Sequence, residues 1–206
     1  MPVESLWQVI VPVKQTEDAK TRLHPPPGVP RAVLARAMAA DTLHAAGIAL
    51  GSRHVVVVTS DPGVREDAEA MGMPTLPDPG KGLNAAISAG LMWAPSARQA
   101  VLLADLPALR SVDLSEALRA CGQHLVAVVP DHTGTGTSLL TSIGARLEPA
   151  FGPDSARRHH ESLGAVVLHP KAPGLRRDVD DACDLRAALA LGVGPHTLAA
   201  LRAALG

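Results

Sequence analysis

The sequence feature that most constrains the fold is the apolar run at residues 101–109, VLLADLPAL, which contains a single acid. A run of this kind between Gln99 and Pro107 is typical of a strand buried on both faces of a parallel sheet. Asp105 then lies at the carboxyl end of the strand, which in open parallel sheets faces the ligand crevice. A carboxylate there is suited to holding a metal ion. The alternative is that Asp105 caps the helix predicted near Ser111, although Ser111 is itself a good N-cap.

Apolar runs alternate along the chain with segments in which apolar residues recur at helical spacing. Strands are predicted at residues 8–13, 54–59, 74–76, 125–130 and 165–168. Helices are predicted at residues 31–50, 62–71, 83–94, 111–121 and 195–205, and another follows Asp181 and ends at Leu191. This alternation favours an α/β fold, a mixed and mainly parallel sheet flanked by helices. The 206 residues fit one domain, 1–206, with a core of Val, Leu, Ala and Ile.

Charge and composition argue against several classes of function. A net charge of −1 without a long Lys/Arg cluster argues against nucleic-acid binding, and Trp7, Trp93 and Phe151 are too few aromatics for base stacking. No apolar stretch approaches the ~20 residues that span a membrane, and the N-terminus lacks the features of a secretory signal. Cys121 and Cys183 lie far apart, which predicts buried thiols in a reducing compartment. We therefore expect a soluble cytoplasmic protein with neither nucleic-acid nor membrane partners.

The loop after the first predicted strand, residues 15–28, is a candidate triphosphate site. Within it or at its start lie four cationic or titratable side chains: Lys14, Lys20, Arg22 and His24. Lys meets phosphate oxygens as a point charge and Arg as a fork. The alternative is a solvated, mobile loop, since Glu17 and Asp18 dilute the charge. The Walker pattern GxxxxGK[ST] does not occur in the chain, which disfavours a P-loop kinase or ATPase.

Two glycine-containing loops are candidate ligand loops. Residues 78–84, DPGKGLN, precede a predicted helix, so their free amides suit a phosphate or a base edge, which Asn84 could bind. The alternative is ordinary turn chemistry. Residues 131–137, DHTGTGT, offer hydroxyls and unhindered amides to an anion, and the alternative is a flexible hairpin loop.

Two further segments carry charge in an informative pattern. In residues 151–160, FGPDSARRHH, Ser155 is a candidate N-cap, and Arg157 and Arg158 at a helix start oppose the macrodipole, which indicates an anionic ligand unless they are simply exposed. In residues 177–181, RDVDD, Asp178 and Asp180 share one side of an extended chain and repel each other unless a cation lies between them. With Asp105 they would supply three oxygen donors to Mg²⁺. The alternative makes Asp180 or Asp181 a helix cap, and we assign Asp181 to that role.

Six segments, taken in order, resemble those of one enzyme family. They are VPVKQTEDAKTRL, GKGLN, LLADLPAL, the GTGT loop, FGPDS and DVDDACDL, and they extend over residues 9–189. Together they resemble the 2-phospho-L-lactate guanylyltransferase family, which includes phosphoenolpyruvate guanylyltransferases and acts in making the deazaflavin coenzyme F420. The resemblance implies a GT-A-like, Rossmann-like nucleotidyltransferase that uses GTP and Mg²⁺.

The resemblance also implies roles for individual residues. The metal ligands would be Asp105, Asp178 and Asp180, and the cradle for a phosphorylated three-carbon acid would be Thr137, Gly152 and Ser155. The triphosphate would meet Lys14, Lys20 and Arg22, and the nucleotide would lie near Gly82, Leu83 and Asn84. Two positions depart from the family pattern, because Asp154 stands where Gly is common and Asp181 where Thr is usual.

The reaction expected from this resemblance is in-line attack by the phosphate of phosphoenolpyruvate or 2-phospho-L-lactate on the α-phosphorus of GTP, with release of pyrophosphate. The residues leave two other hypotheses. A sugar-phosphate or molybdopterin nucleotidyltransferase would need glycines after the first strand, which VPVKQTEDAKTRL lacks. A non-catalytic nucleotide-binding module would tolerate fewer mutually repelling acids. The last predicted helix, 195–205, is interpreted as a packing element or a homodimer contact.

Overall fold

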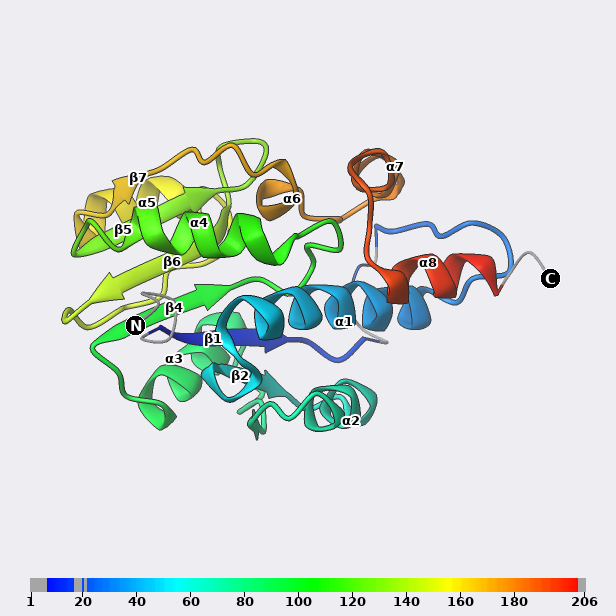
Figure 1. The fold of residues 1–206 in the computed structure, drawn as a ribbon, viewed down its shortest axis with the longest axis horizontal. Coiled ribbons are helices and arrows are strands. Elements are labelled where there is room, and N and C mark those ends of the chain that lie inside the picture. Colours follow the sequence, from blue (N-terminus) through cyan, green and yellow to red (C-terminus); the bar gives the residue numbers. More distant parts are fainter. Residues whose placement is uncertain (1–6, 17–19, 21, 204–206) are drawn as a thin grey trace.

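The computed structural model describes residues 7–16, 20 and 22–203, and its centre is one continuous sheet (Figure 1). The strands are β1 Gln8–Val13, β2 Val55–Thr59, β3 Thr75–Leu76, β4 Arg98–Leu102, β5 Val126–Pro130, β6 Thr137–Ile143 and β7 Val166–Val167. The helices are α1 Arg31–Leu50, α2 Pro62–Ala70, α3 Leu83–Trp93, α4 Ser111–Cys121, α5 Ser155–Leu163, α6 Pro173–Arg176, α7 Ala182–Leu191 and α8 Pro195–Arg202. The predicted last helix extends to residue 205, and residues 204–206 lie outside the described part.

The sheet is mixed and mainly parallel, as predicted. Its strand order is β3-β2-β1-β4-β6-β5-β7. Among the described strands, β6 alone runs antiparallel to its two neighbours, β4 and β5, whereas the other pairs are parallel. The carboxyl ends of β1, β2, β4 and β5 therefore meet the start of β6 at one edge of the sheet.

The strands are buried on both faces because helices cover both. Along β1, Val9 and Val11 belong to the core shared with α1, α2 and α4, while Ile10 belongs to the core shared with α3. This period-two alternation follows from strand geometry. Gly90 lets α3 approach closely, since a Cβ there would lie 2.4 Å from Ile10 Cγ2. The packing explains why apolar runs here are continuous rather than alternating.

Helix α1 is the longest apolar helix in the described ranges, and its length and composition would suffice to cross a membrane. It is a core helix here, because 61% of its apolar window is buried inside the fold. Helix α8 packs against it. The buried Asp41 of α1 accepts hydrogen bonds from the backbone N–H groups of His196 and Thr197, both at 2.9 Å, and so caps α8. The packing role predicted for α8 is confirmed, and the dimer contact stays a prediction.

Several predicted boundaries and roles were wrong. Strand β4 ends at Leu102, before Asp105, because its partner β6 begins at Thr137, and Gln99 lies inside β4 with its side-chain amide bonded to the carbonyls of Leu91 and Ala94. Ser111 and Ser155 were predicted to be N-caps, and neither is. The N-cap positions belong to Arg110 and Asp154, and the two serines are the first helical residues. Cys121 is buried as predicted, but Cys183 is exposed.

Candidate active site

Two adjoining cavities open at the edge where β1, β4 and β5 end and β6 begins. One, of about 340 Å³, is lined on one side by the cationic loop, including Lys14, Thr16 and Lys20. The other, of about 180 Å³, is lined by Thr137, Gly152, Ser155 and Asp178 among others. The cavities share four wall residues: Leu83, Leu103, Asp105 and Asp180. Residues predicted to bind the triphosphate thus line one cavity and residues predicted to bind the acceptor line the other, and Asp105 and Asp180 lie in the wall between them.

Lys20 connects two of the predicted metal ligands. Its ammonium donates to Asp105 Oδ2 and, over 2.7 Å, to Asp180 Oδ1, while Arg22 Nη2 lies 2.7 Å from Asp180 Oδ2. Burial alone would lower the pKa of Lys20, but the two carboxylates outweigh it and raise that pKa. Burial alone would raise the pKa of Asp180, but the hydrogen bond from Lys20 and the two positive charges lower it. The cationic loop therefore contacts the acids directly.

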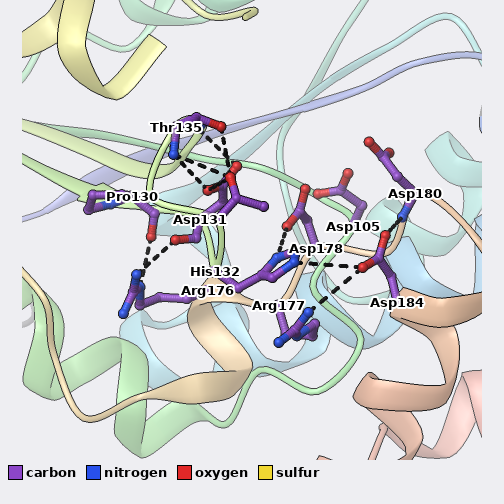
Figure 2. A network of polar contacts seen from close by, with 12 residues as sticks. Asp105, Pro130, Asp131, His132, Thr135, Arg176, Arg177, Asp178, Asp180 and Asp184 are labelled. Atoms are coloured by element: carbon purple, nitrogen blue, oxygen red, sulfur yellow. Dashed lines mark hydrogen bonds and ion pairs between the residues drawn. The ribbon is translucent and has the colours of Figure 1, made fainter. Parts of the chain in front are cut away.

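The pKa of Asp178, unlike that of Asp180, is raised. Burial, then the charges of Asp105 and Asp131, raise the pKa of Asp178 to about 6, although His132 Nδ1, 3.2 Å from Asp178 Oδ1, opposes the rise. Figure 2 shows Asp105, Asp178 and Asp180 side by side. The predicted convergence of these three acids, distant in the sequence, is present in the structure.

The acids fit a divalent cation by their chemistry. Asp105 Oδ1 is buried and has no hydrogen-bond partner in the described part of the chain, and an orphaned carboxylate oxygen is costly without a cation or a donor. Carboxylate oxygens are the donors that Mg²⁺ prefers. Within residues 7–16, 20 and 22–203, however, no group of three or more His, Cys, Asp or Glu side chains is arranged so that it could hold a metal ion as it stands. Instead, the Lys20 ammonium is bonded to both Asp105 and Asp180.

The predicted acceptor residues lie together in the smaller cavity. Thr137 is the first residue of β6 and Ser155 the first of α5, and the Ser155 hydroxyl donates to Thr137 Oγ1 over 2.9 Å. Gly152 has a φ of +126°, which favours glycine, and lies on the same wall. Asp154, where the resembled family commonly has Gly, also has a positive φ, +53°. The convergence follows from β6 starting where β5 ends.

The loop at residues 131–137 differs from the prediction. Its amides are occupied by Asp131, whose Oδ1 accepts from the N–H of Gly134 at 2.8 Å and whose Oδ2 accepts from the N–H of Gly136 at 2.9 Å. Arg176 holds the loop from below by donating to the carbonyls of Pro130 and Asp131 (Figure 2). An Asp ahead of glycines is a common signal for such a side-chain-built turn. These amides are therefore structural, while Asp131, Gly136 and Thr137 of this loop line the smaller cavity.

The loop before α3 is only partly as predicted. Gly82, with a φ of +88°, is the N-cap of α3, and Leu83 borders both cavities. The Asn84 side chain, a candidate for a base edge, is committed elsewhere. Its Nδ2 donates to the Phe151 carbonyl over 3.1 Å, and its Oδ1 accepts from the Phe151 N–H over 2.8 Å. Asn84 thus joins the loop before α3, predicted to lie near the nucleotide, to the loop before α5, predicted to bind the acceptor.

The two predicted anion-binding arginines behave differently. Arg157 pairs with Glu161 on the exposed face of α5, so its place is explained without a ligand. Arg158 has buried guanidinium atoms without a partner in the described residues. Sequence reasoning missed His132, which contacts Asp178 and lies 3.8 Å from Asp184 (Figure 2). It also missed that Thr16 donates through its N–H and hydroxyl to Asp61, the carboxylate that caps α2.

The fold is the one found in solved nucleotidyltransferases. The 4-diphosphocytidyl-2C-methyl-D-erythritol synthase of Anaerococcus prevotii aligns with a TM-score of 0.62 and 9% identity over 91% of this chain and 96% of that one. A CMP:2-keto-3-deoxy-manno-octonic acid synthetase solved with CTP aligns with a TM-score of 0.57 and 15% identity over 90% and 97% of the two chains.

Sequence comparison identifies the family. The family described as guanylyl transferase CofC like matches residues 7–203, and this chain belongs to it. A phosphoenolpyruvate guanylyltransferase of Geodermatophilus obscurus is 48% identical over 95% of this chain and 94% of its own. One of Streptomyces coelicolor is 46% identical over 94% of both. The chain is therefore an enzyme of the guanylyltransferase type, as the sequence motifs predicted.

Proposed function

We propose that this enzyme transfers GMP from GTP to phosphoenolpyruvate and releases pyrophosphate, as a step in coenzyme F420 biosynthesis. The names of the relatives support phosphoenolpyruvate as the acceptor. One structural observation supports the placement of the two substrates. The cationic cavity and the hydroxyl-lined cavity share Asp105 and Asp180 in their common wall. A nucleotide in the first and an acidic acceptor in the second would meet at these carboxylates.

In the proposed reaction, a phosphate oxygen of the acceptor forms a bond to the α-phosphorus of GTP, and the bond to the bridging oxygen of pyrophosphate breaks. No side-chain nucleophile is needed, because the attacking oxygen is already anionic. Catalysis is then positioning and charge neutralisation. Lys14, Lys20 and Arg22 bind the triphosphate, and Lys20 exchanges its carboxylate partners for phosphate oxygens as the nucleotide enters. Thr137, Gly152 and Ser155 orient the acceptor.

We propose Mg²⁺ as the cofactor, held by Asp105, Asp178 and Asp180. When bound, the ion supplies Lewis-acid and charge-neutralising chemistry to the phosphates. The orphaned Asp105 Oδ1 and the raised pKa of Asp178 support this donor set. For location we propose the cytoplasm, supported by free thiols at Cys121 and Cys183.

The test is pyrophosphate release by the purified enzyme with GTP, Mg²⁺ and phosphoenolpyruvate. Parallel arms replace the acceptor by 2-phospho-L-lactate and GTP by ATP or CTP. We expect turnover with GTP and phosphoenolpyruvate, and its loss in Asp105→Asn. Asp67→Asn is the matched control, because Asp67 of α2 pairs with Arg36 of α1 and lines neither cavity. Nucleotide binding without pyrophosphate release for any acceptor would refute the proposal and favour a non-catalytic module.

A further inference from the structure

His159 of α5 is fully buried beneath the smaller cavity and has no place in the function proposed above. Its ring packs edge-on against Phe151, with ring centroids 4.9 Å apart. Both ring nitrogens have partners. The backbone N–H of Ala150 donates to Nε2 over 3.0 Å, and Nδ1 lies 3.1 Å from Thr137 Oγ1.

These contacts determine which nitrogen carries the proton. A backbone N–H can only donate, so Nε2 must be the unprotonated acceptor, and Nδ1 carries the hydrogen. The Nδ1–H group then donates to Thr137 Oγ1. Burial, and secondarily the charge of Arg158, lower the pKa of His159 to about 4, so the ring is neutral at physiological pH.

The consequence is a fixed role for the Thr137 hydroxyl. Ser155 Oγ donates to the same oxygen over 2.9 Å, so Thr137 Oγ1 accepts two hydrogen bonds and both of its lone pairs are used. Its own hydrogen is left to donate, and the described residues supply no acceptor for it. Thr137 and Ser155 both line the smaller cavity, as does Ser138, whose buried hydroxyl also lacks a partner in the described chain.

We propose that His159 is a positioning residue that makes the Thr137 hydroxyl an obligatory hydrogen-bond donor to an anionic oxygen of the acceptor. The inference rests on the proposed function for the identity of that acceptor. With both lone pairs of Thr137 Oγ1 in use, the hydroxyl can only donate. It therefore binds a phosphate or carboxylate oxygen and disfavours an N–H or ammonium group, which would find no lone pair to accept its hydrogen. His159 thus contributes to acceptor specificity without contacting the acceptor.

The test is a double-mutant cycle between His159→Gln and Thr137→Val, read on the KM values for phosphoenolpyruvate and GTP. Glutamine keeps an acceptor for the Ala150 N–H but loses the donor to Thr137. We expect Thr137→Val to raise the KM for phosphoenolpyruvate about 10-fold or more, the scale of one hydrogen bond to a charged group. His159→Gln raises it about 5-fold, leaves the KM for GTP within about twofold, and adds nothing in the Thr137→Val background. Thr137→Ser keeps the hydroxyl, so in that background His159→Gln should still raise the KM for phosphoenolpyruvate.

Additive effects in the cycle, or equal increases in both KM values, would overturn the inference and leave His159 a purely structural residue. If the wild type shows no phosphoenolpyruvate-dependent turnover, the proposed function fails, and the inference is then tested independently. Long-range ¹H–¹⁵N spectra of the wild type at pH 7 give the tautomer of His159, assigned by the signals absent in His159→Gln. We expect the Nδ1–H form, and the Nε2–H form would overturn the inference.

Discussion

Replacing Asn84 separates two roles that this residue could have at the site. In the structure its amide bonds twice to the Phe151 backbone and joins the loop before α3 to the loop before α5. Asn84→Ala removes both hydrogen bonds, at 2.8 Å and 3.1 Å, and strands backbone groups of a residue that is only 6% exposed. At about 1 kcal/mol for each bond, the free energy of unfolding should fall by about 2 kcal/mol. For a chain of this size that corresponds to a Tm lower by about 4–8 °C.

The kinetic consequence identifies the role. Phe151 is followed in the chain by Gly152 and Ser155, which are predicted to bind the acceptor. Loss of the two Asn84–Phe151 hydrogen bonds, here called the clasp, should therefore raise the KM for phosphoenolpyruvate by about 5-fold or more, while the preference for GTP over ATP stays unchanged. Asn84→Asp is the matched variant, because it keeps the acceptor for the Phe151 N–H but places an oxygen against the Phe151 carbonyl, so we expect at least half the loss of stability. Thermal unfolding and initial rates with each nucleotide measure these effects. A selective loss of guanine preference with unchanged stability would refute the clasp and make Asn84 a base-reading residue.

Three further perturbations test the electrostatics and the packing. Lys20→Met removes the ammonium between Asp105 and Asp180 and should lower kcat/KM by about 100-fold or more. Lys171→Met, at an exposed position, is the control and should leave kcat/KM unchanged. Equal rates for the two variants would show that Lys20 has no role in the reaction. Asp41→Ala removes the cap of α8 and should lower the free energy of unfolding by about 1–3 kcal/mol in urea titrations with unchanged KM values, and an unchanged urea midpoint would contradict that role. The pKa of His159 is lowered to about 4, below the usual 6.5, so the unfolded state binds the proton first as the pH falls. Stability should therefore fall between pH 6.5 and 4, by up to about 3 kcal/mol more in the wild type than in His159→Gln, and parallel curves would refute a buried neutral ring.

Local signals in the chain predicted most of the secondary structure. Helix α1 has the predicted bounds, and so does β1, because apolar periodicity is a property of neighbouring residues. Asp61 before Pro62 caps α2, and Asp181 caps α7 with its capping-box partner Asp184. A cap is read within four residues of sequence, so these assignments needed no tertiary information.

The sequence also predicted that Asp105, Asp178 and Asp180 lie together with the cationic loop. The physical reason is topological, since parallel strands end at the same edge of a sheet and bring the loops that leave them to that edge. Composition alone could not have shown that Lys20 would lie between two of the acids. That contact spans 85 residues to Asp105 and 160 to Asp180.

Only the tertiary structure decided which partner each polar side chain takes. Asn84 and Phe151 are 67 residues apart, and Thr137 and His159 are 22 apart, so no local pattern links them. Residue type establishes what a side chain can donate or accept, and a fold determines which of many distant donors and acceptors comes within reach. The sequence therefore determined the elements, the edge of the sheet that carries the site, and the kind of chemistry there. The folded chain alone determined that Asn84 and Asp131 support the site, and that His159 orients a hydroxyl within it.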